Sequence, residues 1–316
     1  MRTSSRMVQG HVLLNLKSAF IFGCIAAYCA TVQAEFPWKA STGDASDPYA
    51  YQNYLYIGSE QFPPSDLGGD IWKYSSKNAC QLYGEDDNRC SQAIVNNPQE
   101  LYGVTGASVD LAWETTTGRP DVVIAVTDSG IKWNDYGKMI DLARKTFLNR
   151  AELPLPQNRS GATVGSYDLN FDGVFNLTDY EEDPRVRDVN ATGYLDPEDL
   201  IFLFSNGIDA DNNGYVDDIA GWDFYEDDND PYDEVQYGHG SGEAEDSTAE
   251  PNNGGGAGVA PNCMVMHMRV GDSFIADIND FAEAVTYATD NGASVVQCAL
   301  GTLNNSRFAQ EAINYA

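Results

Sequence analysis

The chain has 316 residues, of which 42% are hydrophobic, so it can bury a sizeable core in one large domain or two smaller ones. Its formal net charge is −30 at pH 7. This charge argues against nucleic acid as a partner, because phosphates would be repelled, and makes cations the natural counter-ligands.

Residues 1–34 have the organisation of a secretory signal peptide. Arg2, Arg6 and Lys17 precede the apolar run AFIFGCIAAYCATV, and Val32-Gln33-Ala34 forms a small-residue cleavage site. We expect cleavage after Ala34 and a secreted or extracytoplasmic protein. A membrane anchor is the alternative interpretation. The run is shorter than the roughly 20 apolar residues of a spanning helix, so no stable membrane anchor is expected.

Residues 35–104 are rich in Tyr, Pro, Gly, Asp and Asn and show no sustained hydrophobic period. This composition predicts a loop-rich N-terminal extension. Cys80 and Cys90 enclose a short polar loop within it. An exported protein can oxidise such a pair, and the closed loop would then contribute about 2–3 kcal/mol of stability.

Residues 105–316 show the pattern of an α/β domain. The run 122–126, VVIAV, is typical of a buried parallel strand, and 263–270 and 294–301 are further strand candidates. Helical patterns alternate with these strands, which predicts right-handed crossovers on a doubly wound parallel sheet. If the strands are parallel, Cys263 and Cys298 are too far apart to form a disulfide. The predicted helices are 107–114, 197–205, 277–292 and 306–316.

Two polar residues stand out against this framework. Asp128 follows the apolar run directly, and the carboxyl ends of parallel strands are where sites assemble. His239 lies between two glycines, which allow a close backbone approach and an imidazole that projects freely from a helix start. The alternatives are a turn-capping Asp and a histidine in a surface loop.

The segments around both residues resemble the subtilisin-like serine protease family. VVIAVTDSG (122–130) is similar to the family's strand that ends in Asp-Thr/Ser-Gly, and YGHGSG (237–242) to its His-Gly-Thr block. NGIDADNNGYVDDIAGWDF with DDNDP, GAGVAPNCMVMHMRV and DNGASVVQCALG extend the resemblance over about 105–316. The resemblance implies a polypeptide substrate, Asp128 as the orienting acid and His239 as the general base. It also implies Ala299, Leu300 and Gly301 as the strand that pairs with the substrate.

The sequence departs from the family pattern in three places. No Gly-Thr-Ser block carries a nucleophilic serine, so we expect 105–316 to be the front part of a catalytic domain, incomplete at its C-terminus and inactive alone. Ala299 replaces the usual Ser of the substrate strand. Glu243, Glu245 and Asp246 follow His239, so this helix must be partly exposed or neutralised by a partner.

Residues 165–235 form an acidic insert. Between Asp168 and Glu234 there are 21 acids and two arginines. The stretch DLNFDGVFNLTD has the ligand spacing of an EF-hand or dockerin-type loop, with Gly173 at the sharp turn. The expected ligands of this first loop are Asp168, Asn170, Asp172, Val174, Asn176 and Asp179.

A second stretch, DADNNGYVD, repeats the opening of this pattern. Its expected ligands are Asp209, Asp211, Asn213 and Asp217. Ala220 occupies its twelfth position, so Asp218, Asp223 or a distant acid must complete the site. Hard oxygen ligands favour structural Ca²⁺ over zinc, while a solvated acidic loop is the alternative. His267, in the strand 263–270, is interpreted as a packed or edge histidine without a role.

Two functional hypotheses follow. The first is a secreted, calcium-stabilised subtilisin-like serine endopeptidase, represented by its Asp and His. The second is a non-catalytic calcium-binding pseudoprotease that presents the acidic insert to partners.

Overall fold

A computed structural model of the chain describes residues 107–316 except 114, 236–237, 252, 254–255, 274 and 304–305. The predicted signal peptide, the N-terminal extension and the Cys80–Cys90 pair lie outside this part. Within it, no helix has both the length and the apolar character that crossing a membrane requires.

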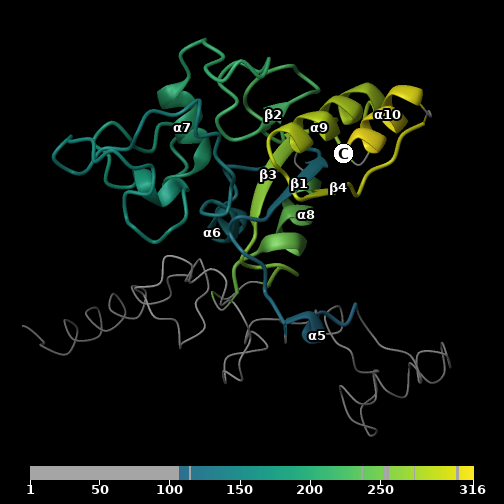
Figure 1. The fold of residues 1–316 in the computed structure, drawn as a ribbon, viewed down its shortest axis with the longest axis horizontal. Helices are drawn as coiled ribbons and strands as arrows, with labels where there is room; N and C mark the ends of the chain where they lie inside the picture. The colour runs from purple at the N-terminus through teal and green to yellow at the C-terminus, as the bar shows by residue number, and fades with distance from the viewer. Residues whose placement is uncertain are drawn as a thin grey trace, which may run out of the picture. The chain divides into compact units, whose positions relative to one another are not determined.

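A parallel sheet forms the centre of the domain, which confirms the predicted α/β fold (Figure 1). Its strand order is β2-β3-β1-β4, and every neighbouring pair is parallel. The two long strands come from the apolar runs that the sequence marks as strands. The strands are β1 (Val123–Asp128), β2 (Trp222–Asp223), β3 (Met264–Arg269) and β4 (Val295–Gln297).

Alternate residues of β3 supply the two faces of the sheet. Met264, Met266 and Met268 belong to one apolar cluster, which also contains Tyr287. Val265, between them in sequence, belongs to a second cluster on the opposite face. Because successive side chains of a strand point to opposite faces, both faces of β3 are covered and the sheet is doubly wound.

Helices cover both faces. α9 (Ile278–Asp290) packs on the methionine face, and α10 (Arg307–Tyr315) lies beside α9 (Figure 1). α6 (Tyr136–Leu142) and α8 (His239–Thr248) contribute to the cluster on the other face. Side-chain caps fix three of the four starts, at Asp135, Asp277 and Ser306, because each accepts the otherwise unsatisfied N–H groups of its first turn.

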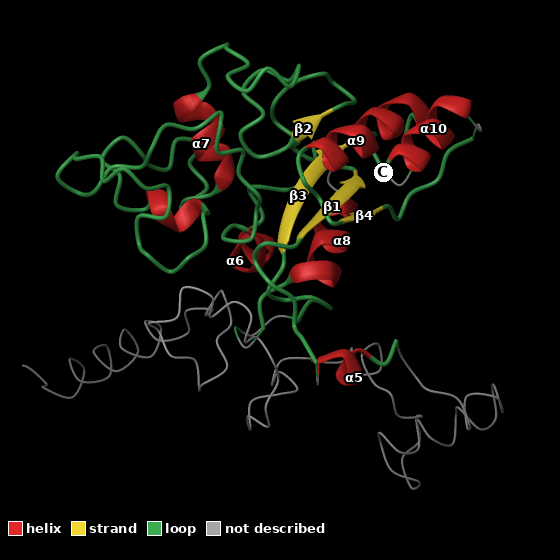
Figure 2. Cartoon of the chain, in the orientation of Figure 1, coloured by secondary structure: helices red, strands yellow, loops and turns green. Residues whose placement is uncertain are grey.

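The acidic insert is mostly loop, with two short helices and the strand β2 (Figure 2). The helices are η3 (Leu177–Tyr180) and α7 (Pro197–Phe204). Leu177, Tyr180 and Leu200 are buried in the same cluster as α6 and α8. Apolar side chains of the insert therefore pack into the core of the domain and anchor the insert to it. Near the start of the described residues lies α5 (Val109–Trp113).

The structure differs from the predicted elements at several positions. α6, η3 and β2 are not predicted from the sequence, and the predicted strand 294–301 ends at Gln297. Beyond Gln297 the chain leaves β1, and Gly301 pairs instead with Ile275. Cys263 and Cys298 are both free, as expected from their positions at opposite ends of parallel strands.

Candidate active site

Asp128 and His239 meet at the carboxyl end of β1. Asp128 is the last residue of β1, His239 is the first residue of α8, and 111 positions separate them in sequence. His239 Nδ1 lies 2.7 Å from Asp128 Oδ1. The carboxylate is 1% exposed and the imidazole 19% exposed. The buried carboxylate of Asp128 therefore holds Nδ1 of the imidazole, while part of the ring stays accessible.

Asp128 is positioned by its own backbone neighbour. The N–H of Ser129 donates to Asp128 Oδ1 at 2.7 Å. Asp128 Oδ2 is buried and has no hydrogen-bond partner among the described residues. Asp128 Oδ1 is therefore shared between the backbone N–H of Ser129 and the ring of His239, which fixes how the carboxylate faces the imidazole.

The glycines beside His239 explain how the helix approaches the strand so closely. Gly238 caps α8 in the left-handed conformation, with φ of 66°. A Cβ at Gly240 would lie 2.3 Å from the carbonyl oxygen of Gly130 and 3.1 Å from Asp128 Cβ. Only a residue without a side chain fits there, because the start of α8 lies against the turn that follows β1.

Serine hydroxyls join the two segments. Ser129 Oγ accepts from the N–H of Gly240 at 3.0 Å and donates to Asp233 Oδ2 at 2.9 Å. Ser241 Oγ accepts from the N–H of Lys132 at 2.9 Å. Both hydroxyls are therefore engaged in holding the loop after β1 against α8.

The acidic residues of α8 are partly exposed or paired, as their charge requires. Asp246 is exposed, and Glu245 forms an ion pair with Lys138 of α6. Glu243 Oε1 lies 3.8 Å from His239 Nε2, and Glu243 Oε2 accepts from Gln297 Nε2 at 2.7 Å. Burial raises the pKa of the Glu243 carboxyl above its usual range.

The residues expected to pair with a substrate lie directly after β4. Ala299 and Gly301 are exposed, and Leu300 is half-buried. The carbonyl oxygen of Gly301 accepts from the N–H of Ala276 at 3.0 Å. Upstream of them, Thr127 Oγ1 donates to the carbonyl oxygen of Gln297 at 3.1 Å, so this segment follows directly from the strand that flanks Asp128.

The first acidic loop, residues 168–179, is organised around its two end carboxylates. Asp168 Oδ2 accepts from the N–H of Gly173 at 3.0 Å, and Asp179 Oδ1 accepts from the N–H of Leu169 at 2.7 Å. Asp168 Oδ1 is buried and has no hydrogen-bond partner in the described part of the chain. Burial raises the pKa of Asp179 to about 6. Of the other expected ligands, Asn170 is exposed and Asp172 half-buried, while Val174 and Asn176 are buried.

The second stretch brings its residues together differently from the expected ligand set. Asp209 Oδ2 accepts from the N–H of Gly214, as in the first loop, and Asp209 Oδ1 accepts from the N–H of Asn213. Asp217 accepts instead from the N–H groups of Asn206 and Gly207. Asp211 lies in a cluster with Glu152 and Asp218. The sequence names Asp218 as a residue that could complete the site, and Glu152 is a distant acid of the kind that it leaves unidentified.

A further loop with the same spacing, DVNATGYLDPED (188–199), is also missed by sequence reasoning. Asp188 Oδ2 accepts from the N–H of Gly193 at 2.8 Å, and Asp199 Oδ1 accepts from the N–H of Val189 at 2.7 Å. These bonds repeat those of 168–179 twenty positions later. The spacing itself could have revealed the loop, but Asp196 with Pro197 reads as a helix start. Asp196 does cap α7, through the N–H of Glu198.

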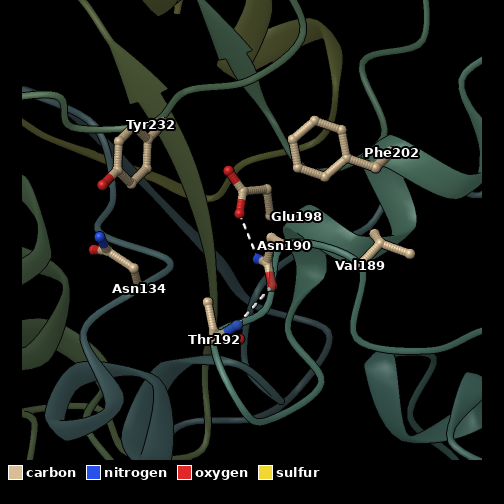
Figure 3. A pocket seen from close by; sticks show the side chains of 7 residues that line it. All are labelled: Asn134, Val189, Asn190, Thr192, Glu198, Phe202 and Tyr232. Carbon is tan, nitrogen blue, oxygen red and sulfur yellow. Dashed lines mark hydrogen bonds between the residues drawn. The ribbon is translucent and has the colours of Figure 1, made fainter.

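A hollow in the surface of the insert lies beside this loop (Figure 3). Asn190 and Glu198, two of its lining residues, are hydrogen bonded to each other. Tyr232 and Phe202 supply aromatic walls. Neither Asp128 nor His239 lines this hollow. The lining residues are Asn134, Val189, Asn190, Thr192, Glu198, Phe202 and Tyr232.

His267 is packed inside the sheet, as interpreted from the sequence. It is 1% exposed, and its Nε2 lies 3.2 Å from Thr146 Oγ1. The ring of Trp133 meets it edge-on at 5.6 Å. Burial lowers the pKa of His267 to about 3. The imidazole is therefore neutral at physiological pH and serves as a packing residue.

Comparison with known proteins gives the family. Residues 119–316 match the model of the Subtilase family, so the chain belongs to the subtilase family. It is 36% identical over 121 residues to the Thermophilic serine proteinase of Bacillus sp. (strain AK1), covering 37% of this chain and 29% of that protein. It is 40% identical over 101 residues to Thermitase of Thermoactinomyces vulgaris, covering 31% of this chain and 35% of that protein.

A third relative is the Halolysin-like extracellular serine protease Nep of Natrialba magadii, 28% identical over 136 residues. That match covers 39% of this chain and 25% of the relative. The chain thus spans between a quarter and just over a third of the length of these curated relatives. The family resemblance and the parallel α/β fold are both confirmed.

Proposed function

We propose that this chain carries the acid and the base of a secreted serine endopeptidase that hydrolyses polypeptides. The observation that carries the proposal is the 2.7 Å contact between His239 Nδ1 and Asp128 Oδ1 at the carboxyl end of β1. The names of the relatives, which are serine proteinases, support the same reaction class.

In this proposal His239 acts as the general base through Nε2. Its Nδ1–H donates to Asp128, which fixes the tautomer and stabilises the imidazolium that forms when a serine hydroxyl gives up its proton. The imidazolium then returns this proton to the leaving amine. Asp128 keeps its negative charge throughout, so the pair lowers the barrier by stabilising developing charge without a proton transfer to Asp128.

Neither Ser129 nor Ser241 is proposed as the nucleophile of the triad. The hydroxyls of Ser129 and Ser241 already hold the loop after β1 against α8. A serine at the accessible edge of His239 would complete the site. Ala299, Leu300 and Gly301 would pair with an extended substrate, because their backbone continues from β4 past the Asp128 end of the sheet.

Calcium is proposed as the structural ion of the acidic insert. The buried Asp168 Oδ1 lacks a hydrogen-bond partner among the described residues, and an oxygen of this kind fits a hard cation. Burial also raises the pKa of Asp196 to about 7 and that of Asp179 to about 6, so ionised carboxylates are costly in this region without a counter-charge. Bound Ca²⁺ would offset that cost and order the loops.

The experiment uses the protein expressed from its complete reading frame. We expect a fluorophosphonate probe to label one serine and the protein to hydrolyse an unstructured polypeptide. His239→Ala should reduce kcat by roughly 10⁶-fold and Asp128→Asn by roughly 10⁴-fold, the orders seen when such groups are removed. Asp246→Asn, an exposed carboxylate on the same helix, is the control and should retain activity. A folded protein without labelling or hydrolysis would favour the non-catalytic alternative.

A further inference from the structure

Three carboxylates from two distant segments of the chain lie close together. Glu152, Asp211 and Asp218 each place one oxygen within 4.8 Å of the others. Glu152 is 4% exposed and Asp218 fully buried. Asp211 and Asp218 belong to the second acidic stretch, whereas Glu152 lies in the segment between α6 and the insert.

The negative charge of this cluster is not balanced by any ion pair found among the described residues. Its hydrogen-bond donors are neutral: Asn149 Nδ2 donates to Asp211 and Asp218, and Tyr287 Oη donates to Asp218 at 2.7 Å. The site therefore carries a surplus of acceptors, and two of its three carboxylate residues, Glu152 and Asp218, are buried.

One carboxylate oxygen of Glu152 indicates that a ligand binds here. Glu152 Oε1 accepts from the N–H groups of Ala210 and Asp211, at 2.7 and 3.2 Å. Glu152 Oε2 is buried and has no hydrogen-bond partner in the described residues. An unsatisfied carboxylate oxygen at this depth is costly unless a cation or a donor meets it.

We propose that Glu152, Asp211 and Asp218 bind one Ca²⁺ ion, with Glu152 completing the second acidic stretch from outside its loop. Two oxygens bound to the same Ca²⁺ at 2.3–2.6 Å are at most about 5.2 Å apart, and the three carboxylates meet this limit. The donor set contains only oxygen, which suits calcium better than zinc or copper. Glu152 thereby supplies the ligand that Ala220 cannot.

This ion would hold the insert to the sheet. Asn149 N donates to the carbonyl oxygen of Ile219, and Tyr287 belongs to α9, so the cluster lies where the segment before the insert, the second stretch and α9 meet. β2 begins four residues after Asp218 and joins the sheet beside β3. The inference deepens the calcium part of the proposed function, because it assigns a site whose key ligand lies outside any EF-hand-like spacing.

The test compares Glu152→Gln with the wild-type protein and with Glu283→Gln, an exposed glutamate on α9. Calcium alone is titrated calorimetrically into protein stripped with EDTA. Glu152→Gln should bind one equivalent fewer, or bind it at least 10-fold more weakly, and Glu283→Gln should match the wild type. Tb³⁺ emission excited through tyrosine should fall in parallel, because Tyr287 is hydrogen bonded to Asp218.

Thermal unfolding gives a second test, because the effect of Glu152→Gln on the unfolding temperature should change sign between EDTA and calcium. In EDTA, Glu152→Gln should unfold at the same or a higher temperature, because the amide keeps the bonds from Ala210 and Asp211 and removes a repelling charge. In calcium it should unfold at a lower temperature than the wild type. If Glu152→Gln does not fold, Asp211→Asn decides the matter, since residue 211 is exposed and tolerates the change.

The outcomes distinguish the calcium site at Glu152 from the broader proposal that the acidic insert binds calcium. If Glu152→Gln binds calcium as the wild type does, the site is wrong while calcium at the other loops stands. If the wild type binds no calcium, both are wrong. If Asp211→Asn is used instead, loss of one equivalent of bound calcium supports the site, and calcium binding equal to that of the wild type overturns it.

Discussion

Gly240 lies against the carbonyl oxygen of Gly130, so that a Cβ at position 240 would come within 2.3 Å of that oxygen. The contact joins the start of α8 to the turn after β1, and the contact between Asp128 and His239 depends on this approach.

Gly240→Ala should therefore separate the helix from the strand. The added methyl group meets backbone, which cannot rotate away, so we expect a loss of about 3 kcal/mol in unfolding free energy and near-complete loss of the proposed proteolysis. Gly242→Ala is the matched control on the same helix, because a Cβ there meets nothing within 4 Å. It should be neutral or stabilise by up to about 1 kcal/mol. Equal effects of the two variants in denaturant titrations would contradict this explanation.

His267 should make the fold sensitive to acid. Its pKa is about 3 in the folded protein and near 6.5 in an unfolded chain. Between these values the unfolded state binds a proton that the folded state does not, so the stability present above pH 6.5 is lost as pH falls. The contribution is up to about 1.4 kcal/mol per pH unit.

His267→Gln removes this titration and keeps a group that can bond to Thr146. The difference in unfolding free energy between the variant and the wild type should change steadily between pH 6.5 and 4 and stay constant above pH 7.5. Parallel stability curves over the whole range would show that His267 does not titrate as its burial demands.

The sequence predicts the long elements well because their signals are local. The strands β1 and β3 come from apolar runs, and the start of α9 is marked by Asp277. Short elements lack such signals: β2 has two residues, and α6 begins among turn-forming residues such as Asn134 and Gly137. These elements form because they pack against the sheet and the core. Local propensity does not capture such tertiary contacts.

The residues of the candidate sites also divide into those with a signal in the sequence and those without one. The spacing of 168–179 can be read from one stretch, and the adjacency of Asp128 and His239 follows from the family resemblance. Glu152 carries no signal, because its role depends on which distant loop packs beside it. Asp217 also has the spacing of a metal ligand, and its carboxylate accepts from the backbone N–H groups of Asn206 and Gly207, so its role as a ligand stays a prediction.

The two described cysteines should differ in reactivity. Cys298 is exposed beside the proposed substrate segment, whereas Cys263 is buried. Burial of its sulfur raises the pKa of each thiol, so labelling of Cys298 should be slow at pH 7 and faster at pH 9. Iodoacetamide should modify Cys298 in the native protein and Cys263 only after unfolding, as located by mass spectrometry. Native labelling of Cys263 would mean that the amino end of β3 opens readily.

Calcium removal should destabilise the protein through the first acidic loop. A site held at 100 times its dissociation constant contributes about 2.7 kcal/mol, so excess EDTA should lower the unfolding temperature by several degrees. Asp168→Asn should reproduce part of this loss in calcium and show little effect in EDTA. The amide oxygen can still accept from Gly173, while the negative charge at the unpartnered oxygen is gone.

Asp227→Asn separates the loss of a ligand from the loss of a charge. Asp227 is an exposed acid of the same insert with a positive φ of 60°, a conformation that asparagine adopts readily. Its replacement removes one negative charge outside the three acidic loops, so reduced repulsion should leave the unfolding temperature unchanged or slightly raised in both calcium and EDTA. An unfolding temperature that does not respond to EDTA in the wild type would exclude structural calcium, and equal calcium dependence in Asp168→Asn and Asp227→Asn would exclude the first loop as its site.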